Sequence, residues 1–256
     1  MSAYQFDFSV VLQFENLAVI ARGLIVTLIL TAITSAIAVL LGWIGAAVTA
    51  SGRGPLRSLV CWAIEIFRNV PALVQVFFWS FAFPLILPRD VRVPLLFDNP
   101  AVSWLQSQIG VHAYYFAALV MGLSLNTAAY LADIFRAGIE SVGEGQIAAA
   151  LASGLTRRQV MREIVFPQAL HVSFPALATR LAHTMKNTAL GVFVPVPELM
   201  SALLTATSRT FRALEFLIAG AALYLVVGWA ESALLARIDR RRAPWAIAES
   251  EARWTR

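Results

Sequence analysis

The chain has 256 residues, of which 59% are hydrophobic and 14% charged, and its mean hydropathy is +0.72. A water-soluble domain could not hide so much apolar surface, so the composition predicts an integral membrane protein. The net charge of +5 comes from arginines at the ends of apolar runs, which follows the positive-inside rule and argues against a solvated nucleic-acid-binding face. The single cysteine, Cys61, excludes an internal disulfide and a cysteine-ligated metal site.

A membrane-spanning helix needs about 20 mostly apolar residues, and the sequence predicts an all-α, polytopic protein with about five such helices. All of residues 1–256 are expected to form one transmembrane domain, in which an external segment, 1–21, precedes the first span. The predicted spans are 23–48, 71–87, 114–135, 172–194 and 214–235.

Several local patterns refine this outline. In the first span Ala38, Gly42 and Ala46 recur every four residues, which predicts close approach of another helix. Helical pattern in 58–67 is interrupted at residues 68–71, because Pro71 disfavours a helical Val70. The stretch 88–112 is expected to be an external loop. The fourth span carries enough polar residues that it should be broken or buried among other helices.

Arginine placement predicts the orientation. Most arginines fall on one side of the predicted spans, and the opposite side holds only Arg22, Arg89, Arg92, Arg209 and Arg212. The N-terminus is therefore expected outside and the C-terminal tail, 237–256, inside, in a bacterial inner membrane. The basic cluster at residues 240–242 could bind anionic lipid, but a topological anchor is the simpler interpretation.

The longest segment between spans, 140–170, is predicted to lie in the cytoplasm. Residues 145–154 favour a short alanine-rich helix that ends at Gly154 in a left-handed conformation. Thr156 and Gln159 then form a capping box that starts a second helix, which Phe166 and Pro167 should close. Two short helices with a glycine elbow predict a rigid docking element for another protein.

This loop resembles the permease signature of ATP-binding-cassette (ABC) importers, at Ala149, Ala150, Gly154, Ile164 and Pro167. It departs from that signature at Ala148, where the family has an acidic residue, and at Phe166, where it has leucine. Nearly the whole chain resembles the polar amino-acid permeases of the histidine, glutamine and glutamate/aspartate type. The matching motifs are Gly23 with Thr27, residues 67–71 with Gln75, 129–139, 167–169 and 186–188.

The resemblance implies a type I, MetI-like importer permease that moves polar amino acids, with glutamate or aspartate favoured. It implies a second permease subunit, identical or homologous, two ATPase subunits and a soluble external binding protein, with no cofactor. Contacts to the ATPase are expected at Gly145, Ala149, Ala150, Gly154, Leu155, Arg158 and Pro167. The only lysine, Lys186, follows Met185 rather than a glycine, so the chain lacks a Walker A loop and ATP energy must enter through a partner.

Polar groups at membrane depth are candidates for the substrate pathway. On the third span Asn126, Tyr130 and Asp133 share one face. The fourth span adds Arg180, His183, Lys186 and Asn187. Asp133 could meet the substrate ammonium, and Arg180 or Lys186 its carboxylates. A structural interpretation stays open, since Asp133 and Arg136 are also spaced for an intrahelical ion pair.

The sequence offers less support for two other functional classes. A secondary transporter or channel would often show inverted repeats, and no matching halves are found. A membrane-embedded hydrolase would need a nucleophile near a base or a metal, and the serines, the cysteine and the three histidines show no such arrangement. Co-purification with an ATPase would separate the importer from both.

Overall fold

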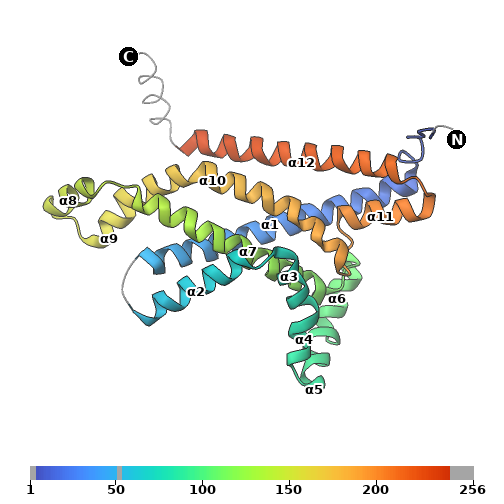
Figure 1. Cartoon of the computed structure of the whole chain (residues 1–256), viewed down its shortest axis with the longest axis horizontal. Helices are drawn as coiled ribbons and strands as arrows, with labels where there is room; N and C mark the ends of the chain where they lie inside the picture. Colours follow the sequence, from blue (N-terminus) through green and yellow to red (C-terminus); the bar gives the residue numbers. More distant parts are fainter. Residues whose placement is uncertain (1–3, 51–53, 243–256) are drawn as a thin grey trace, which may run out of the picture.

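The computed structural model describes residues 4–50 and 54–242, and every regular element in those ranges is a helix, which confirms the all-α prediction. The longest helices run side by side (Figure 1). They are α1 (Phe14–Ala50), α7 (Ala113–Glu140), α10 (Phe166–Asn187) and α12 (Ala213–Arg242). The shorter elements are α2 (Pro55–Asn69), α3 (Ala72–Phe77), η1 (Phe78–Ala82), α4 (Phe83–Ile86), α5 (Arg89–Arg92), η2 (Val93–Phe97), α6 (Pro100–Ile109), α8 (Glu144–Ala152), α9 (Arg157–Gln159), η3 (Val160–Val165), η4 (Thr188–Phe193) and α11 (Leu199–Thr210).

Three helices in the described ranges, α1, α7 and α12, are long and apolar enough to cross a membrane. A fourth crossing is added if α2 and the helical stretch Ala72–Ile86 are taken as one bent span. The expected fourth span, in α10, is not among them, since Arg180, His183 and Lys186 lower its hydropathy. However, α10 lies between α7 and α12 along the same axis, as expected of a polar span shielded by its neighbours (Figure 1).

The small residues of α1 let α7 approach closely, as predicted. Ala38 and Ala46 are fully buried, and a Cβ atom added at Gly42 would lie 2.6 Å from the Cβ of Leu131 on α7. A distance that short is incompatible with any side chain, so the two backbones touch there. Leu131 and Phe135 of α7 continue the same core toward α10.

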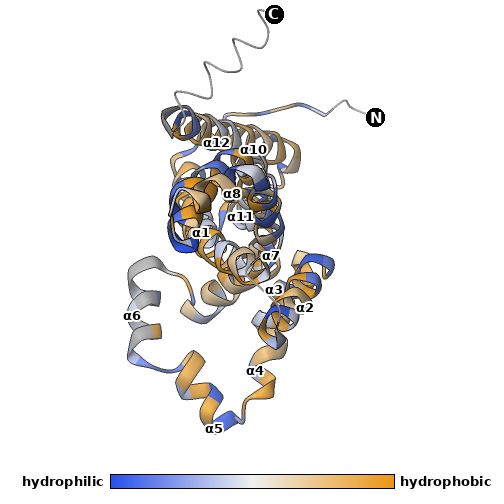
Figure 2. Cartoon of the chain, turned by 90° about the vertical axis from the view of Figure 1, so that its left-hand side faces the viewer, coloured by the Kyte–Doolittle hydropathy of each residue, from blue (hydrophilic) through white to orange (hydrophobic). Residues whose placement is uncertain are grey.

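A break separates α2 from the second predicted span, as the sequence predicted. α2 ends at Asn69, Val70 is extended, and α3 begins after Pro71. The axes of α2 and the following helical stretch differ by 106°. In Figure 2, α4 and α5 lie away from the bundle, and the exposed Leu85 and Ile86 side chains of α4 suit a hydrocarbon or protein neighbour.

The expectation of a loop at 88–112 is wrong, because that stretch is largely helical. Asn99 caps α6 by accepting a hydrogen bond from the Val102 N–H, and Gly110 ends that helix in the left-handed conformation. The sequence carried this signal, since asparagine before proline and a later glycine are typical helix boundaries.

The expected stop at Phe166 and Pro167 is also wrong. From Arg157 to Asn187 the chain is helical without interruption, through α9, the π-helical η3 and α10. The widened η3 turn explains this, because the Phe166 N–H bonds to the carbonyl of Met161, five residues back. Pro167, which lacks an N–H, then fits the first turn of α10.

The bundle has two distinct ends (Figure 1). The pair α8 and α9 projects at one end, where α12 also finishes, while α11 and the start of α1 lie at the other. At that second end the N-terminal segment is held to the start of α12: the Tyr4 hydroxyl and the Asp7 N–H donate to Glu215, and Arg212 donates to the Gln5 carbonyl.

Candidate functional site

The joint between α2 and α3 is the centre of a polar network. Its break leaves carbonyls without helical partners, and side chains from other positions supply the missing donors. Gln75 donates to the carbonyls of Phe67 and Val70 at 2.8 Å each, and Asn126 of α7 donates to Phe67 at 2.9 Å. The Tyr130 hydroxyl donates to the Arg68 carbonyl at 3.1 Å. Irregular backbone at membrane depth is tolerated only where protein groups satisfy it in this way.

Arg180 of α10 closes the network from the opposite side. Its Nη2 donates to Asn126 Oδ1 at 2.6 Å, and its guanidinium lies over the Tyr130 ring, 3.8 Å from the centroid. The structure therefore brings Asn126, Tyr130 and Arg180 together, from two different predicted spans. In this arrangement all three are engaged in holding the α2–α3 joint against α7 and α10.

Asp133 is engaged by two arginines. It forms an ion pair with Arg68 of α2, and Arg136 approaches its Oδ1 at 3.3 Å. Arg68 in turn pairs with Glu65 at 2.8 Å. The intrahelical pair left open by the sequence is present, and the additional Arg68 contact ties α7 to the end of α2. A substrate ammonium would have to compete with both guanidinium groups for this carboxylate.

The remaining pathway candidates lie on another face of α10. Thr179, His183 and Lys186 are exposed and line a cavity of about 430 Å³ that α12 borders with Ser232 and Asp239. Asn187 is half-buried at the end of α10, outside the lining of that cavity. Arg180 is therefore separated from His183 and Lys186 by the rotation of the helix, although all three are close in sequence.

The glycine elbow between α8 and α9 has the predicted geometry. Gly154 has φ +90°, its N–H bonds to the Leu151 carbonyl at 3.0 Å, and the Leu155 N–H bonds to the Ala150 carbonyl at 3.2 Å. These two bonds form a Schellman motif. Thr156 and Gln159 then form the predicted capping box, which starts α9.

A small core makes this elbow rigid. Ala150, Val142, Val160 and Val165 are buried together, and Leu155 packs against them. By contrast, Gly145, Ala149, Arg158 and Pro167 are exposed. Of the residues expected to contact an ATPase, Ala150 and Leu155 therefore shape the pair of helices from within, whereas the other side chains face outward. We call residues 142–165 the elbow knob.

Arg158 also borders an apolar cavity of about 470 Å³ between the knob and the end of α1. Trp43 lines it from α1, and its ring packs edge-on against Phe135 and Phe166. The start of α10, which directly follows the knob, is thereby packed against α1, and the same tryptophan contacts α7.

Glu198, which the sequence analysis did not single out, is fully buried at the start of α11. Its carboxylate accepts from the N–H groups of Met200 and Ser201 at 2.8 Å each and from the Tyr224 hydroxyl at 3.2 Å. Burial raises the pKa of this carboxyl group, against the effect of those donors. An acidic residue directly before an apolar run was the available signal for this helix cap.

The Gly23 and Thr27 motif of α1 contacts the same start of α11. The Thr27 hydroxyl oxygen accepts from the Leu199 N–H at 3.0 Å, and a Cβ atom at Gly23 would lie 2.7 Å from that of Ala202. The motif thus fixes α1 against the start of α11. In the described part of the chain, no group of three or more histidine, cysteine, aspartate or glutamate residues is arranged to hold a metal ion.

The chain is similar in sequence to several known permeases. The chain is 32% identical over 209 residues to the arginine transport system permease protein ArgU of Corynebacterium glutamicum, an alignment that covers 81% of this chain and 63% of that protein. It is 31% identical to the probable amino-acid permease protein YxeN of Bacillus subtilis, covering 80% and 83%. It is 29% identical to the glutamate/aspartate import permease protein GltK of Escherichia coli O157:H7, covering 94% and 100%.

Solved structures agree with these relatives. A crystal structure described as an amino acid ABC transporter with histidines matches with a TM-score of 0.74 at 29% identity, covering 93% of this chain and 100% of that one. A chain of the MetNI methionine ABC transporter matches with a TM-score of 0.66 at 17% identity, covering 90% and 99%, and supports the fold alone.

The family model described as "binding-protein-dependent transport system inner membrane component" matches residues 38–244, which contain α7, the elbow knob, α10, α11 and α12. The chain is a multi-pass inner membrane protein with the fold of the type I importer permeases. It belongs to the family of binding-protein-dependent transport system inner membrane components.

Proposed function

We propose that this chain is the membrane subunit of an ABC importer for polar amino acids, driven by ATP hydrolysis on separate subunits. The relatives carry the names of arginine, glutamate/aspartate and glutamine permeases, which supports a polar amino acid as cargo, with glutamate or aspartate favoured by the motifs at residues 67–71 and 186–188. The single structural observation that carries the proposal is the elbow knob, a compact pair of helices with its own core that projects from one end of the bundle (Figure 1).

The proposed partners follow from this assignment. An ATPase subunit receives the knob, a second permease subunit completes the pathway, and a soluble binding protein delivers the amino acid at the opposite end. The exposed Gly145, Ala149 and Arg158 form the contact surface for the ATPase, while Ala150 and Leu155 hold that surface in shape. In this proposal the chain itself hydrolyses no ATP.

The orientation we propose is N-terminus out and C-terminus in. The arginine distribution supports it, and so does the position of the knob at the same end of the bundle as the end of α12 (Figure 1). Of the proposed cytoplasmic tail, 243–256 lies outside the described residues.

For the pathway we propose two roles. His183 and Lys186, on the exposed face of α10, line the route, and Lys186 meets a substrate carboxylate. Asn126, Tyr130, Arg180 and Asp133 border it through the α2–α3 joint, and Asn187 lies where α10 ends. Uptake assays of Lys186→Ala and Asp133→Asn, with assembly verified, test this assignment. Normal uptake by both variants would remove both residues from the pathway.

The importer itself is tested by reconstitution. The chain is co-expressed with its candidate ATPase, binding protein and second permease, and uptake of radiolabelled glutamate, glutamine and arginine is measured in proteoliposomes with and without internal ATP. In a cysteine-free Cys61→Ala background, Gly145→Cys should cross-link to the ATPase, whereas the matched Thr205→Cys at the opposite end should not. Uptake that follows an ion gradient without ATP, or a cross-link from residue 205 alone, would overturn the proposal.

A further inference from the structure

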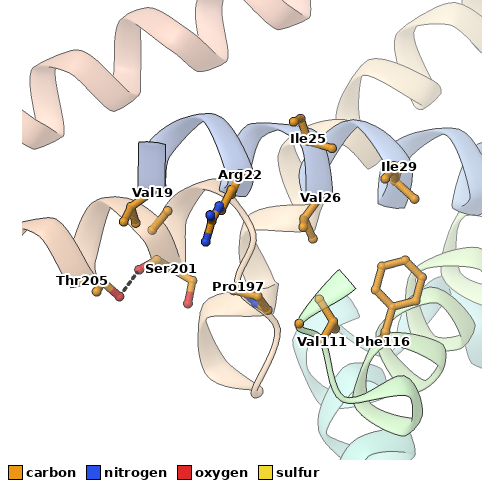
Figure 3. A pocket seen from close by; sticks show the side chains of 13 residues that line it. Val19, Arg22, Ile25, Val26, Ile29, Val111, Phe116, Pro197, Ser201 and Thr205 are labelled. Atoms are coloured by element: carbon orange, nitrogen blue, oxygen red, sulfur yellow. Dashed lines mark hydrogen bonds between the residues drawn. The ribbon is translucent and has the colours of Figure 1, made fainter. Parts of the chain in front are cut away.

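A cavity of about 690 Å³ lies between α1, the start of α7 and α11, away from the polar network and from the elbow knob. Figure 3 shows that its wall is not uniform. Arg22, Ser201 and Thr205 lie toward the N-terminal end of α1, whereas Ile29 and Phe116 lie at the other end. The cavity is therefore polar at one end and apolar along the rest of its length.

Arg22 supplies the charge at the polar end. In Figure 3 its side chain reaches from α1 toward Ser201 and Pro197. Within residues 4–50 and 54–242 no hydrogen bond or ion pair is found for its guanidinium, and no acidic residue is among those that line the cavity. A guanidinium with five donors and no acidic neighbour is a ready site for a phosphate.

The position of Arg22 along α1 matches the edge of a bilayer. From Gly23 to Ala50 the helix has no charged residue, so Arg22 lies at the boundary of the apolar run. From Arg22 to Ile29 the helix rises about 10 Å at about 1.5 Å per residue. That length fits within one leaflet, which is about half of a hydrocarbon core of about 30 Å. This holds whichever side of the membrane the N-terminus faces.

We propose that this cavity binds an anionic phospholipid of the leaflet at the N-terminal end of α1. Its phosphate lies at Arg22 beside the hydroxyls of Ser201 and Thr205, and one acyl chain follows Val26 and Ile29 toward Phe116. A polar amino acid fits poorly, because its ammonium would meet no carboxylate in the lining. The lipid would bridge α1 and α11, the two helices that also meet at Gly23 and Ala202.

The test is native mass spectrometry of the detergent-solubilised full chain, titrated with phosphatidylglycerol or with phosphatidylcholine of identical acyl chains. The wild type should retain phosphatidylglycerol preferentially. Arg22→Gln should lower its occupancy about fivefold, as expected for one basic side chain near a membrane surface, and should leave phosphatidylcholine unchanged. Arg22→Lys should keep most of the preference. Arg209→Gln is the matched control, since Arg209 is exposed on α11 but does not line the cavity.

A second measurement works on the wild-type chain and so does not depend on any variant folding. Phosphatidylglycerol with a photoreactive group at the end of one acyl chain should label the segment that holds Val111 and Phe116. Equal loss of phosphatidylglycerol from the Arg22 and Arg209 variants would overturn the proposal. So would labelling confined to other helices, or a cross-link showing that a second copy of the chain occupies the cavity.

Discussion

Replacement of Gly154 should strain the elbow through its backbone alone. The residue has φ +90°, and a Cβ atom added there would meet nothing within 4 Å, so no steric contact enters the cost. An alanine in such a conformation costs about 1 kcal/mol, and a valine about 2 kcal/mol because its branched Cβ crowds the backbone further. Asparagine tolerates the left-handed region and should cost only a few tenths of the roughly 1 kcal/mol expected for alanine.

These energies convert into local opening of the elbow knob. A change of about 1.4 kcal/mol is tenfold in an equilibrium, so alanine should raise the open population about fivefold and valine about thirtyfold. Amide hydrogen exchange measures this directly at Gly154 and Leu155, whose N–H groups make the two bonds of the motif. Uptake per ATP hydrolysed in the reconstituted importer should fall in the same order, from asparagine to alanine to valine.

Gly143→Val is the control, since Gly143 also has open space around it but has φ −61°. It should leave exchange within the knob nearly unchanged. Asparagine and valine have similar bulk, and this comparison separates backbone strain from size. If Gly154→Asn opened the knob as much as Gly154→Val, or if Gly143→Val opened it equally, the strain argument would be refuted.

Three further substitutions test the packing and the polar network by chemical or thermal unfolding of the purified chain. Gly42→Val should destabilise the chain by about 1–3 kcal/mol, because α1 and α7 must separate to accommodate the new side chain. Gly145→Val, in open space, should be close to neutral, and equal effects of the two substitutions would contradict the close approach of the helices. Asn126→Leu should cost about 1–3 kcal/mol through the lost hydrogen bonds to Phe67 and Arg180. A change in unfolding free energy below about 0.5 kcal/mol would show that the α2–α3 joint does not depend on Asn126. Glu198→Ala should cost about 2–4 kcal/mol, because it leaves two N–H groups and the Tyr224 hydroxyl without an acceptor. Glu198→Gln should cost less, and the reverse order would count against the role of Glu198 as a helix cap.

The sequence predicted helix ends, breaks and packing faces wherever residues close together in the chain decide them. The elbow is such a case, because a glycine after an alanine-rich helix and a threonine three residues before a glutamine fix both helix ends. The break before Pro71 is another. The small-residue face of α1 was also predictable, since periodicity alone shows that Ala38, Gly42 and Ala46 share one side.

The partners of the polar residues were not readable in the same way. Asn126 and Tyr130 were singled out as pathway residues, but their hydrogen bonds run to the α2–α3 joint, far away in sequence. Arg180 and Lys186 were grouped by proximity along the chain, and the helix separates them onto different faces. The position of Glu198 as a helix cap had a local signal, but its contact with Tyr224 and the adjacent hydrogen bond from Leu199 to Thr27 join residues far apart in sequence, which no local pattern encodes.

The amino-acid sequence by itself therefore determined that this chain is a helical membrane protein with a glycine-jointed pair of short helices, since apolar run length, helix caps and small-residue spacing are properties of neighbouring residues. Only the tertiary structure decided that the helix continues through Pro167, that Asp133 is shared by Arg68 and Arg136, and that Arg22 heads an apolar cavity. The physical reason is that burial, ion pairing and cavity shape depend on which helices meet. Packing over the whole bundle decides which helices meet, so the sequence of one segment cannot predict it.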